Sequence, residues 1–427
     1  MIHARRFVVA LALVARIGMP QSASEMGTIP KKLTLDDAIQ IALARNPMLA
    51  AAQESIEISR GDAVNAGLRP NPAISLQTEN YPYFQSDRGP FLQSQEMTAR
   101  FDYEVQTRNR VELRRSSAEL AVTRDRRVYQ DEVRLLRLQV QSAYYGVLLA
   151  KSNLELARSI LVQTDEVIAL NRTRFEQGDI SELELTRAQV ERLRFAGDVF
   201  AARIELKNST AALLALMNGG DLSAEIEAAG TLGQPVNLGL PVGLHVDDFL
   251  ALASRERPDL RAAEAEIERS MAQNRLQRAI ASPNITVGGG YKRNGPDDSL
   301  VLGITIPLNI FNRNQGGIIR AEAEGRRALH LAEATRNQLR LQVQQAFNSY
   351  QINQERVEYI RSEQLRQAEQ ASRVTLAAYR LGGMPLMDYL DAQRQYRDTA
   401  RVFNQAMFDK QLSLFSLAAA VGKGELQ

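Results

Sequence analysis

The sequence predicts a mainly α-helical protein with a small β part, built as a tandem repeat of long antiparallel coiled-coil helices and two β-hairpins. The first observation is a duplication, in which Asp37 and Pro47 recur as Asp248 and Pro258, each 211 residues later. The second is an apolar row that repeats every seven residues, and the third is a pair of alternating apolar-polar segments in each half. Sustained heptads are typical of coiled coils, and alternation is typical of strands.

The composition argues against several classes of protein. With 427 residues, a net charge of +2 and no clustered basic stripe, the chain offers no electrostatic case for a nucleic-acid partner. The absence of cysteine excludes disulfides, thiolate metal sites and a lipid-anchored N-terminal cysteine. His3, His245 and His330 each stand alone in their segments, so we expect no His-rich metal site and no cofactor.

The first 24 residues are typical of a secretory signal peptide, with two arginines, an apolar run over residues 7–15 and small residues at 22–24. A soluble N-terminal helix is the alternative. No later stretch approaches the ~20 apolar residues that a membrane-spanning helix needs. Any crossing of a bilayer by this chain must therefore use strands.

The repeats divide the chain. Repeat one covers residues 33–218, repeat two covers residues 244–422, and a short tail follows at 423–427. Each repeat opens with a shorter helix, which we expect to end before Pro72 or Pro283. Residues 219–243 between the repeats are rich in Gly and Pro without a sustained period, which predicts a linker or a small equatorial element.

Each repeat contains a predicted β-hairpin, at residues 73–105 in repeat one and 284–308 in repeat two. In the second, apolar residues alternate from Leu300 to Leu308 and predict one continuous apolar face, with residues 292–299 as the loop. The glycines at 288–290 lack the Lys-Ser/Thr of a phosphate loop, and indicate a bend or close packing. A soluble sheet packed on helices is the alternative to a membrane sheet, for which Tyr81, Phe91 and Tyr291 would supply interfacial aromatic residues.

A very long helix follows each hairpin. In repeat one we expect it to run from about Asn109 to the tip at Gly178, roughly 100 Å at 1.5 Å per residue, and to return over residues 181–217. Repeat two should run out over residues 315–380 and back over 386–421, with a less regular outgoing heptad. The outgoing row of repeat one is Val133, Val140, Val147, Leu154, Leu161, Ile168 and Phe175.

The turns between these helices are the most distinctive stretches. Gly178 in repeat one and the pair Gly382-Gly383 in repeat two supply the backbone freedom that ends a helix, and Pro385 suits the start of the next. Asp388 and Asp391 follow three residues apart and so share one helix face.

Taken together, these features resemble the TolC family of outer-membrane efflux proteins, over nearly everything from Leu33 to Gly422. The segments that carry the resemblance most specifically are LTLDDAIQIALARNP, IPLNIFNRNQGGI and YRLGGMPLMDYLDAQ. Within the family, the RPNP at residues 69–72 is most similar to the CzcC-like heavy-metal cation efflux subgroup. The resemblance implies a homotrimer in which each chain gives four strands to a 12-stranded transmembrane β-barrel and its helices to a trimeric α-barrel tunnel through the periplasm.

The resemblance also assigns roles at the tips. It places Asp388 and Asp391 in a carboxylate ring at the periplasmic entrance, where they would concentrate cations. Tyr379 and Glu184 match positions that close the entrance through contacts between the two tip hairpins, and Arg187 is expected to pair with a tip carboxylate. The alternative for the two aspartates is a local one, in which first-turn carboxylates are favoured by the helix dipole.

The tips would also bind the periplasmic adaptor protein. The residues implied are Gly178, Gly382, Gly383, Met384 and Leu386. Met384 stands where the best-known members carry a basic residue for a closing contact, so the closing network should be weaker or differently built.

The function implied is a passive exit duct in the outer membrane of a Gram-negative bacterium. Substrates, which the subgroup suggests are heavy-metal cations, would be delivered by a resistance-nodulation-division pump of the inner membrane and its adaptor. Export of drugs or of type I secreted proteins stays open, as does a periplasmic coiled-coil rod without a pore. The chain has no nucleophile-base pair, zinc signature or dinucleotide fingerprint at motif spacing, so we do not expect an enzyme.

Overall fold

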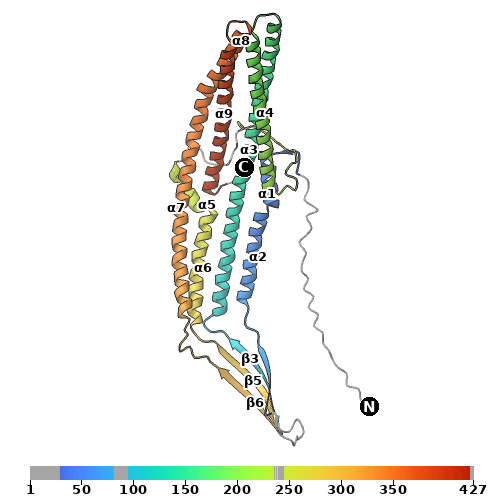
Figure 1. Cartoon of the computed structure of the whole chain (residues 1–427). Helices are drawn as coiled ribbons and strands as arrows, with labels where there is room; N and C mark the ends of the chain where they lie inside the picture. Colours follow the sequence, from blue (N-terminus) through green and yellow to red (C-terminus); the bar gives the residue numbers. More distant parts are fainter. Residues whose placement is uncertain (1–28, 81–94, 235, 237, 239–244, 424–427) are drawn as a thin grey trace, which may run out of the picture.

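The computed structural model describes residues 29–80, 95–234, 236, 238 and 245–423. The predicted signal peptide, Tyr81 and Phe91 lie outside these residues. The chain is a long helical rod with a small sheet at one end and the two helical tips at the other (Figure 1). This arrangement confirms the predicted mainly helical class with a small β part.

The helices account for most of the rod. In repeat one they are α1 (Leu35–Arg45), α2 (Pro47–Gly67), α3 (Arg110–Glu176) and α4 (Glu182–Leu216). In repeat two they are α5 (Val246–Glu256), α6 (Pro258–Ile280), α7 (Gln315–Tyr359), the π-helical turn η2 (Ile360–Leu365), α8 (Arg366–Arg380) and α9 (Leu386–Val421). Among the residues described, none of these helices is both long and apolar enough to cross a bilayer.

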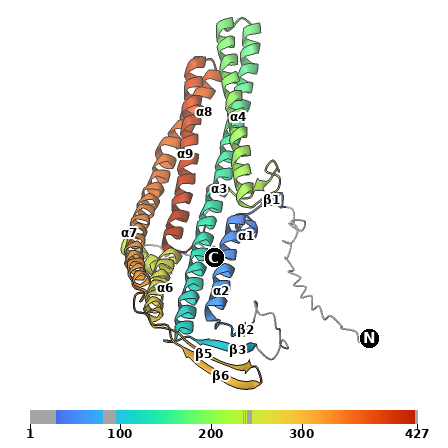
Figure 2. The ribbon, with the colours of Figure 1, turned by 60° about the horizontal axis from the view of Figure 1, so that its bottom comes forward.

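The prediction of one opening helix per repeat was wrong, because each is split before a proline, at Asn46-Pro47 and at Arg257-Pro258. A residue before proline is driven out of the α region, and Asn46 has φ −65° and ψ 123°. The split is where two helices meet end to end. Asn46 Nδ2 donates to the Leu216 carbonyl at the end of α4 (3.0 Å), and Arg257 Nη1 donates to the Ala420 carbonyl at the end of α9 (3.3 Å). The helices α2 and α6, which follow the two splits, thus continue the axes of α4 and α9 toward the sheet, as Figure 2 shows.

Two short strands pair with each other near the middle of the rod. β1 (Lys32–Leu33) pairs in parallel with β4 (Glu227–Ala228), which lies in the segment between the repeats. The Tyr144 hydroxyl of α3 is within hydrogen-bond distance of both the Leu33 carbonyl (2.9 Å) and the Ala229 carbonyl (2.6 Å). The largest apolar core of the molecule includes Leu33 and Ala228 of these strands and joins α1, α3, α4 and α9.

The two hairpins form one antiparallel sheet in the order β2-β3-β5-β6, because β3 of repeat one pairs with β5 of repeat two. The strands are β2 (Ala73–Glu79), β3 (Glu96–Val105), β5 (Ile285–Asn294) and β6 (Asp297–Thr305). The predicted loop at residues 292–299 was wrong: the strands continue to a two-residue turn, where Gly295 has φ +58°. Likewise β6 ends at Thr305, so Leu308 lies beyond the predicted strand face.

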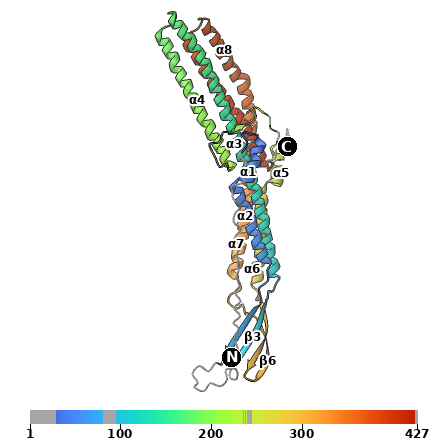
Figure 3. The ribbon, with the colours of Figure 1, turned by 90° about the vertical axis from the view of Figure 1, so that its right-hand side faces the viewer.

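The sheet has two chemically opposite faces. Register places Ile74, Phe101, Gly289 and Leu302 side by side on one face, and all the large apolar side chains of the strands except Val301 lie on it. Leu76, Leu300 and Leu302 are each 81% exposed in the single chain. The opposite face carries polar and charged residues. The sheet extends away from the helices, and within the part of the chain that the structure describes no helix covers its apolar face (Figure 3).

The irregular outgoing heptad of repeat two has a structural cause. Its inner row runs Val343, Tyr350, Val357, then Leu365, Ser372 and Tyr379, so one step spans eight residues. That step falls on η2, where the wider π turn takes up one extra residue. The π turn therefore keeps the row on the inner side of the helix up to the tip.

Candidate functional site at the helical tips

The two tips are built by glycines with left-handed backbone. Gly178 has φ +81° between α3 and α4, and Gly382 has φ +76° between α8 and α9. Gly383 N donates to the Ala378 carbonyl (2.9 Å), which closes the helix end as a Schellman-type turn does. Figure 1 places both tips at the end of the rod remote from the sheet.

An apolar cluster holds the two tip hairpins together. It contains Val167, Ile168, Ala188, Tyr379, Leu386, Tyr389 and Leu390. Leu386 is only 2% exposed, so its side chain packs inside the tip in the single chain, and its predicted part in binding an adaptor stays a prediction. Met384 is half-buried, whereas Leu381, which sequence reasoning missed, is 88% exposed.

Tyr379 is the centre of the contact between the hairpins. Its hydroxyl donates to Asn171 Oδ1 of α3, and its ring stacks on Tyr389 with centroids 6.0 Å apart. Arg174 of α3 covers the same ring at 5.3 Å and donates to the Arg380 carbonyl at 2.9 Å. Burial raises the pKa of Tyr379, and the nearby negative charge of Glu184 adds to the rise. Glu184 thus affects the pKa of Tyr379 through its negative charge, while Asn171 accepts the hydrogen bond from the Tyr379 hydroxyl.

The two predicted entrance carboxylates differ in their surroundings. Both Asp388 and Asp391 are exposed on the first turns of α9. Asp388 makes no hydrogen bond or ion pair with any residue that the structure describes. Asp391 accepts a hydrogen bond from Arg394 Nη1 at 2.6 Å. One carboxylate of each chain is therefore free, and the other has a cation beside it.

Arg394 also makes a two-point ionic contact between the hairpins, which sequence reasoning missed. Its Nε and Nη2 donate to Glu191 Oε1 (2.8 Å) and Oε2 (3.2 Å) on α4, and Glu191 is only 6% exposed. Burial by itself raises the pKa of Glu191, but the guanidinium groups of Arg394 and Arg194 outweigh burial and leave the pKa lowered. We call this contact the Glu191–Arg394 bridge.

A weak sequence signal for the bridge exists. Glu191 and Arg394 lie one residue out of step in the repeat, at the same height above the two tips, and carry opposite charges. Arg187, expected to pair with a tip carboxylate, is exposed and makes no ion pair with the residues that the structure describes. Arg394 takes that role, because it lies on the same helix as Asp391, one turn away.

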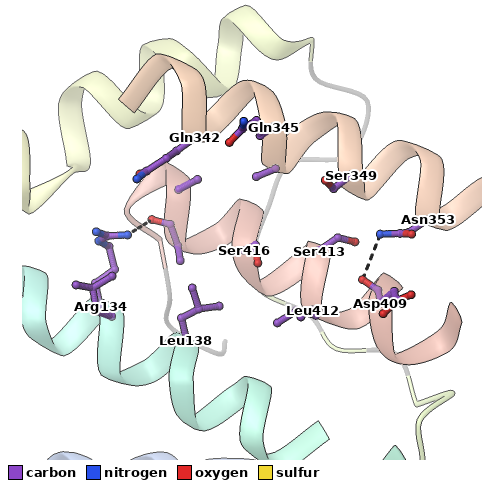
Figure 4. A pocket seen from close by; sticks show the side chains of 14 residues that line it. Arg134, Leu138, Gln342, Gln345, Ser349, Asn353, Asp409, Leu412, Ser413 and Ser416 are labelled. Atoms are coloured by element: carbon purple, nitrogen blue, oxygen red, sulfur yellow. Dashed lines mark hydrogen bonds between the residues drawn. The ribbon is translucent and has the colours of Figure 1, made fainter. Parts of the chain in front are cut away.

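A hollow of about 520 Å³ lies between α3, α7 and α9 near the middle of the rod (Figure 4). Its lining includes Arg134, which donates to the Ala419 carbonyl at 3.0 Å, and Asp409. Asp409 is already paired with Arg356 at 3.1 Å and accepts from Gln405 at 2.8 Å. Arg134 and Asp409 are thus each paired with other neighbours and do not form a nucleophile-base arrangement.

No group of three or more metal-ligating side chains occurs among the described residues.

The chain matches the outer membrane efflux protein family over residues 38–219 and 250–423. It is 27% identical to the cobalt-zinc-cadmium resistance protein CzcC of Cupriavidus metallidurans over 366 residues, covering 85% of this chain and 83% of that protein. It is 26% identical to the pyoverdine export outer membrane protein OpmQ of Pseudomonas putida, covering 84% and 79%.

The fold agrees with solved structures. The CmeC outer membrane channel of Campylobacter jejuni superposes with a TM-score of 0.78 at 16% sequence identity, over 92% of this chain and 86% of that one. A duplicated helical rod with a two-faced sheet at one end and paired tips at the other is thus the fold that this chain shares with that channel. The chain belongs to the outer membrane efflux protein family. It is an efflux channel of the Gram-negative outer membrane that extends into the periplasm, and its relatives are channels, not enzymes.

Proposed function

We propose that three copies of this chain form a continuous duct, with a 12-stranded β-barrel in the outer membrane and an α-helical tunnel in the periplasm. The observation that carries the proposal is the two-faced sheet, whose apolar face is exposed in the single chain. Four strands leave open edges at β2 and β6, and open edges are not tolerated in lipid. Pooling strands from three chains pairs these edges and turns the apolar face to lipid.

The outer edges of the helical part support the same assembly. An apolar stripe at heptad spacing lies exposed along α4, including Leu183, Val190 and Ile204. Val374 and Leu381 are exposed along and just beyond α8, a helix that lies on the other side of the upper rod from α4 (Figure 3). Stripes on two different sides are what a closed ring of identical chains requires, because each contact then joins unlike surfaces.

We infer further that the duct carries divalent heavy-metal cations supplied by a resistance-nodulation-division pump and a periplasmic adaptor. The name of the similar CzcC protein and the exposed Asp388 and Asp391 support this substrate class. The adaptor would bind the exposed tips around Gly178, Gly382, Gly383 and Met384. Tyr379, Glu184 and the Glu191–Arg394 bridge would hold the entrance closed until the adaptor engages.

Export of an organic molecule is the second candidate, because the chain is also 26% identical to the pyoverdine export outer membrane protein OpmQ. Growth of a strain lacking this channel separates the two. If metal export is correct, the deletion lowers tolerance of zinc, cobalt or cadmium, and the intact gene restores it. Unchanged metal tolerance together with lost tolerance of organic compounds would replace the substrate class and leave the duct in place.

Removing the entrance carboxylates should strongly weaken block by trivalent cations. Three copies place three or six carboxylates around a narrow mouth, where their fields add. In planar bilayers, we expect Asp388→Asn/Asp391→Asn to weaken hexamminecobalt block by about 100-fold, and Asp388→Asn to account for most of the loss because Asp391 is paired with Arg394. Glu166→Gln, which removes an exposed carboxylate of α3 paired with Arg380, is the matched control. Equal block in the double variant and the wild type would contradict the ring.

A further inference from the structure

The polar face of the sheet carries charges that are matched in pairs. Arg100 Nε donates to Asp102 Oδ1 at 2.7 Å, and Lys292 Nζ lies 2.7 Å from Glu96 Oε2. Register places further carboxylates on this face at Glu79, Glu104 and Asp297. The two cations on this face, Arg100 and Lys292, therefore offset only part of its negative charge.

The glycines of β5 and β6 make room for one of these pairs. A Cβ built on Gly288 would lie 1.9 Å from Asp102 Oδ1 and 2.9 Å from Arg100 Nε. A Cβ on Gly303, one strand further, would lie 2.9 Å from Arg100 Nη2. The Arg100 side chain thus crosses β5 and reaches β6 while lying flat on the sheet. Any larger residue at Gly288 or Gly303 would push the guanidinium away from the backbone.

This geometry gives the strand glycines a purpose that neither a bend nor a phosphate loop explains. Gly288 and Gly303 face each other across β5 and β6, and Asp102 is directly opposite Gly288 on β3. Glycine within a strand weakens the strand. The space that the Arg100–Asp102 pair needs explains why glycine is nevertheless present at these two positions.

We propose that Gly288 and Gly303 hold Arg100 flat against the wall of the outer-membrane bore, where it offsets Asp102 and limits the preference of the bore for cations. The inference rests on the proposed barrel, in which the polar face lines the lumen. Three guanidinium groups held on the wall leave the lumen wide. A duct that concentrates cations at its periplasmic entrance then releases them at the outer end, because the bore attracts them less strongly.

The chain has no cysteine, so a single introduced thiol can report the local charge. Val301 lies on the polar face two residues from Gly303, beside the position that the Arg100 guanidinium reaches, and its neighbour Leu302 lies on the apolar face. We would measure the rates at which cationic and anionic methanethiosulfonate reagents modify Val301→Cys in the assembled protein in outer-membrane vesicles. Removing one positive charge about 7 Å away should raise the cationic-to-anionic rate ratio about fivefold in Arg100→Gln. Asp102→Asn should lower the ratio by a similar factor.

Two matched variants complete the test. Arg100→Lys keeps the charge and should keep the ratio within about twofold of the wild type, and Lys292→Gln removes a more distant cation and should change it less than Arg100→Gln does. An unchanged ratio in Arg100→Gln, with Val301→Cys reactive and Leu302→Cys protected, would overturn the role of Arg100 while leaving the barrel intact. Equal reactivity of Leu302→Cys and Val301→Cys would overturn the barrel and the inference with it.

Discussion

Replacing Arg394 with leucine is expected to open the periplasmic entrance and to raise single-channel conductance severalfold in planar bilayers. The change leaves Glu191 as a buried, unpaired carboxylate between the two hairpins, which costs roughly 3 kcal/mol. An equilibrium shifts by more than 100-fold for such a change, so an entrance that is closed in the wild type becomes mostly open. Asp391 is released at the same time, so the open pore should select cations more strongly.

The control is a second arginine that also joins the hairpins. Arg380 pairs with Glu166 at 2.8 Å, but the two side chains are 49% and 58% exposed, and exposed pairs contribute about 0–1 kcal/mol. Arg380→Leu should therefore leave the conductance within about twofold of the wild type. Adding Glu191→Leu to Arg394→Leu should recover part of the closed state, because no unpaired charge is then buried. The role of the bridge is refuted if the Arg394 and Arg380 variants conduct alike.

The bridge also predicts the effect of pH on the entrance. The pKa of Glu191 is lower in the folded protein than its usual value of about 4.3. The Glu191–Arg394 bridge therefore stabilises the closed entrance fully above that value, and this stabilisation is lost as pH falls through the folded pKa. Conductance should stay constant from neutral pH down to about pH 4 and rise only below it. Glu191→Gln should remove this acid opening, whereas opening already at pH 6 would point to a different group.

Replacing Arg257 with leucine is expected to cause the largest loss of stability. Arg257 is 2% exposed and its guanidinium binds Asp259, Gln342 Oε1 (2.7 Å) and the Ala420 carbonyl. Its loss leaves Asp259 without its partner and the end of α9 without a positive charge, which together cost roughly 3–5 kcal/mol. The melting temperature of the assembled protein, followed by circular dichroism, should fall by roughly 3–6 °C.

The equivalent position of repeat one supplies the comparison for this experiment. Asn46 stands before Pro47 as Arg257 stands before Pro258, and it binds the Leu216 carbonyl of α4 with a neutral amide. Asn46→Ala should cost only about 1–2 kcal/mol, because it removes a helix cap and one hydrogen bond but strands no charge. Similar melting temperatures for Asn46→Ala and Arg257→Leu would show that the buried charge at Arg257 contributes nothing.

Features written in local patterns could be predicted from the sequence. The duplication, the long heptads, the glycine turns at Gly178 and Gly382 and the alternation of apolar residues in the strands depend on neighbours within a few positions. Periods of seven and of two residues report helix and strand directly, because one face of each element must be buried or must meet lipid. The faces of Asp388 and Asp391 followed from helical spacing alone.

Only the tertiary structure could decide the features that join distant segments. The splits at Asn46 and Arg257 coincide with the ends of α4 and α9, and the Glu191–Arg394 bridge joins charges that resemble an ordinary solvated helix surface in sequence. The eight-residue step of the inner row falls on the π turn η2. The row on both sides of η2 is packed against α3 or α9, as Tyr379 is against Asn171, so the extra residue has to be taken up within the turn. The sequence by itself thus determined the elements and their repetition. Which charges are buried together was decided by three-dimensional packing, because the energy of an ion pair depends on its surroundings and not on its position along the chain.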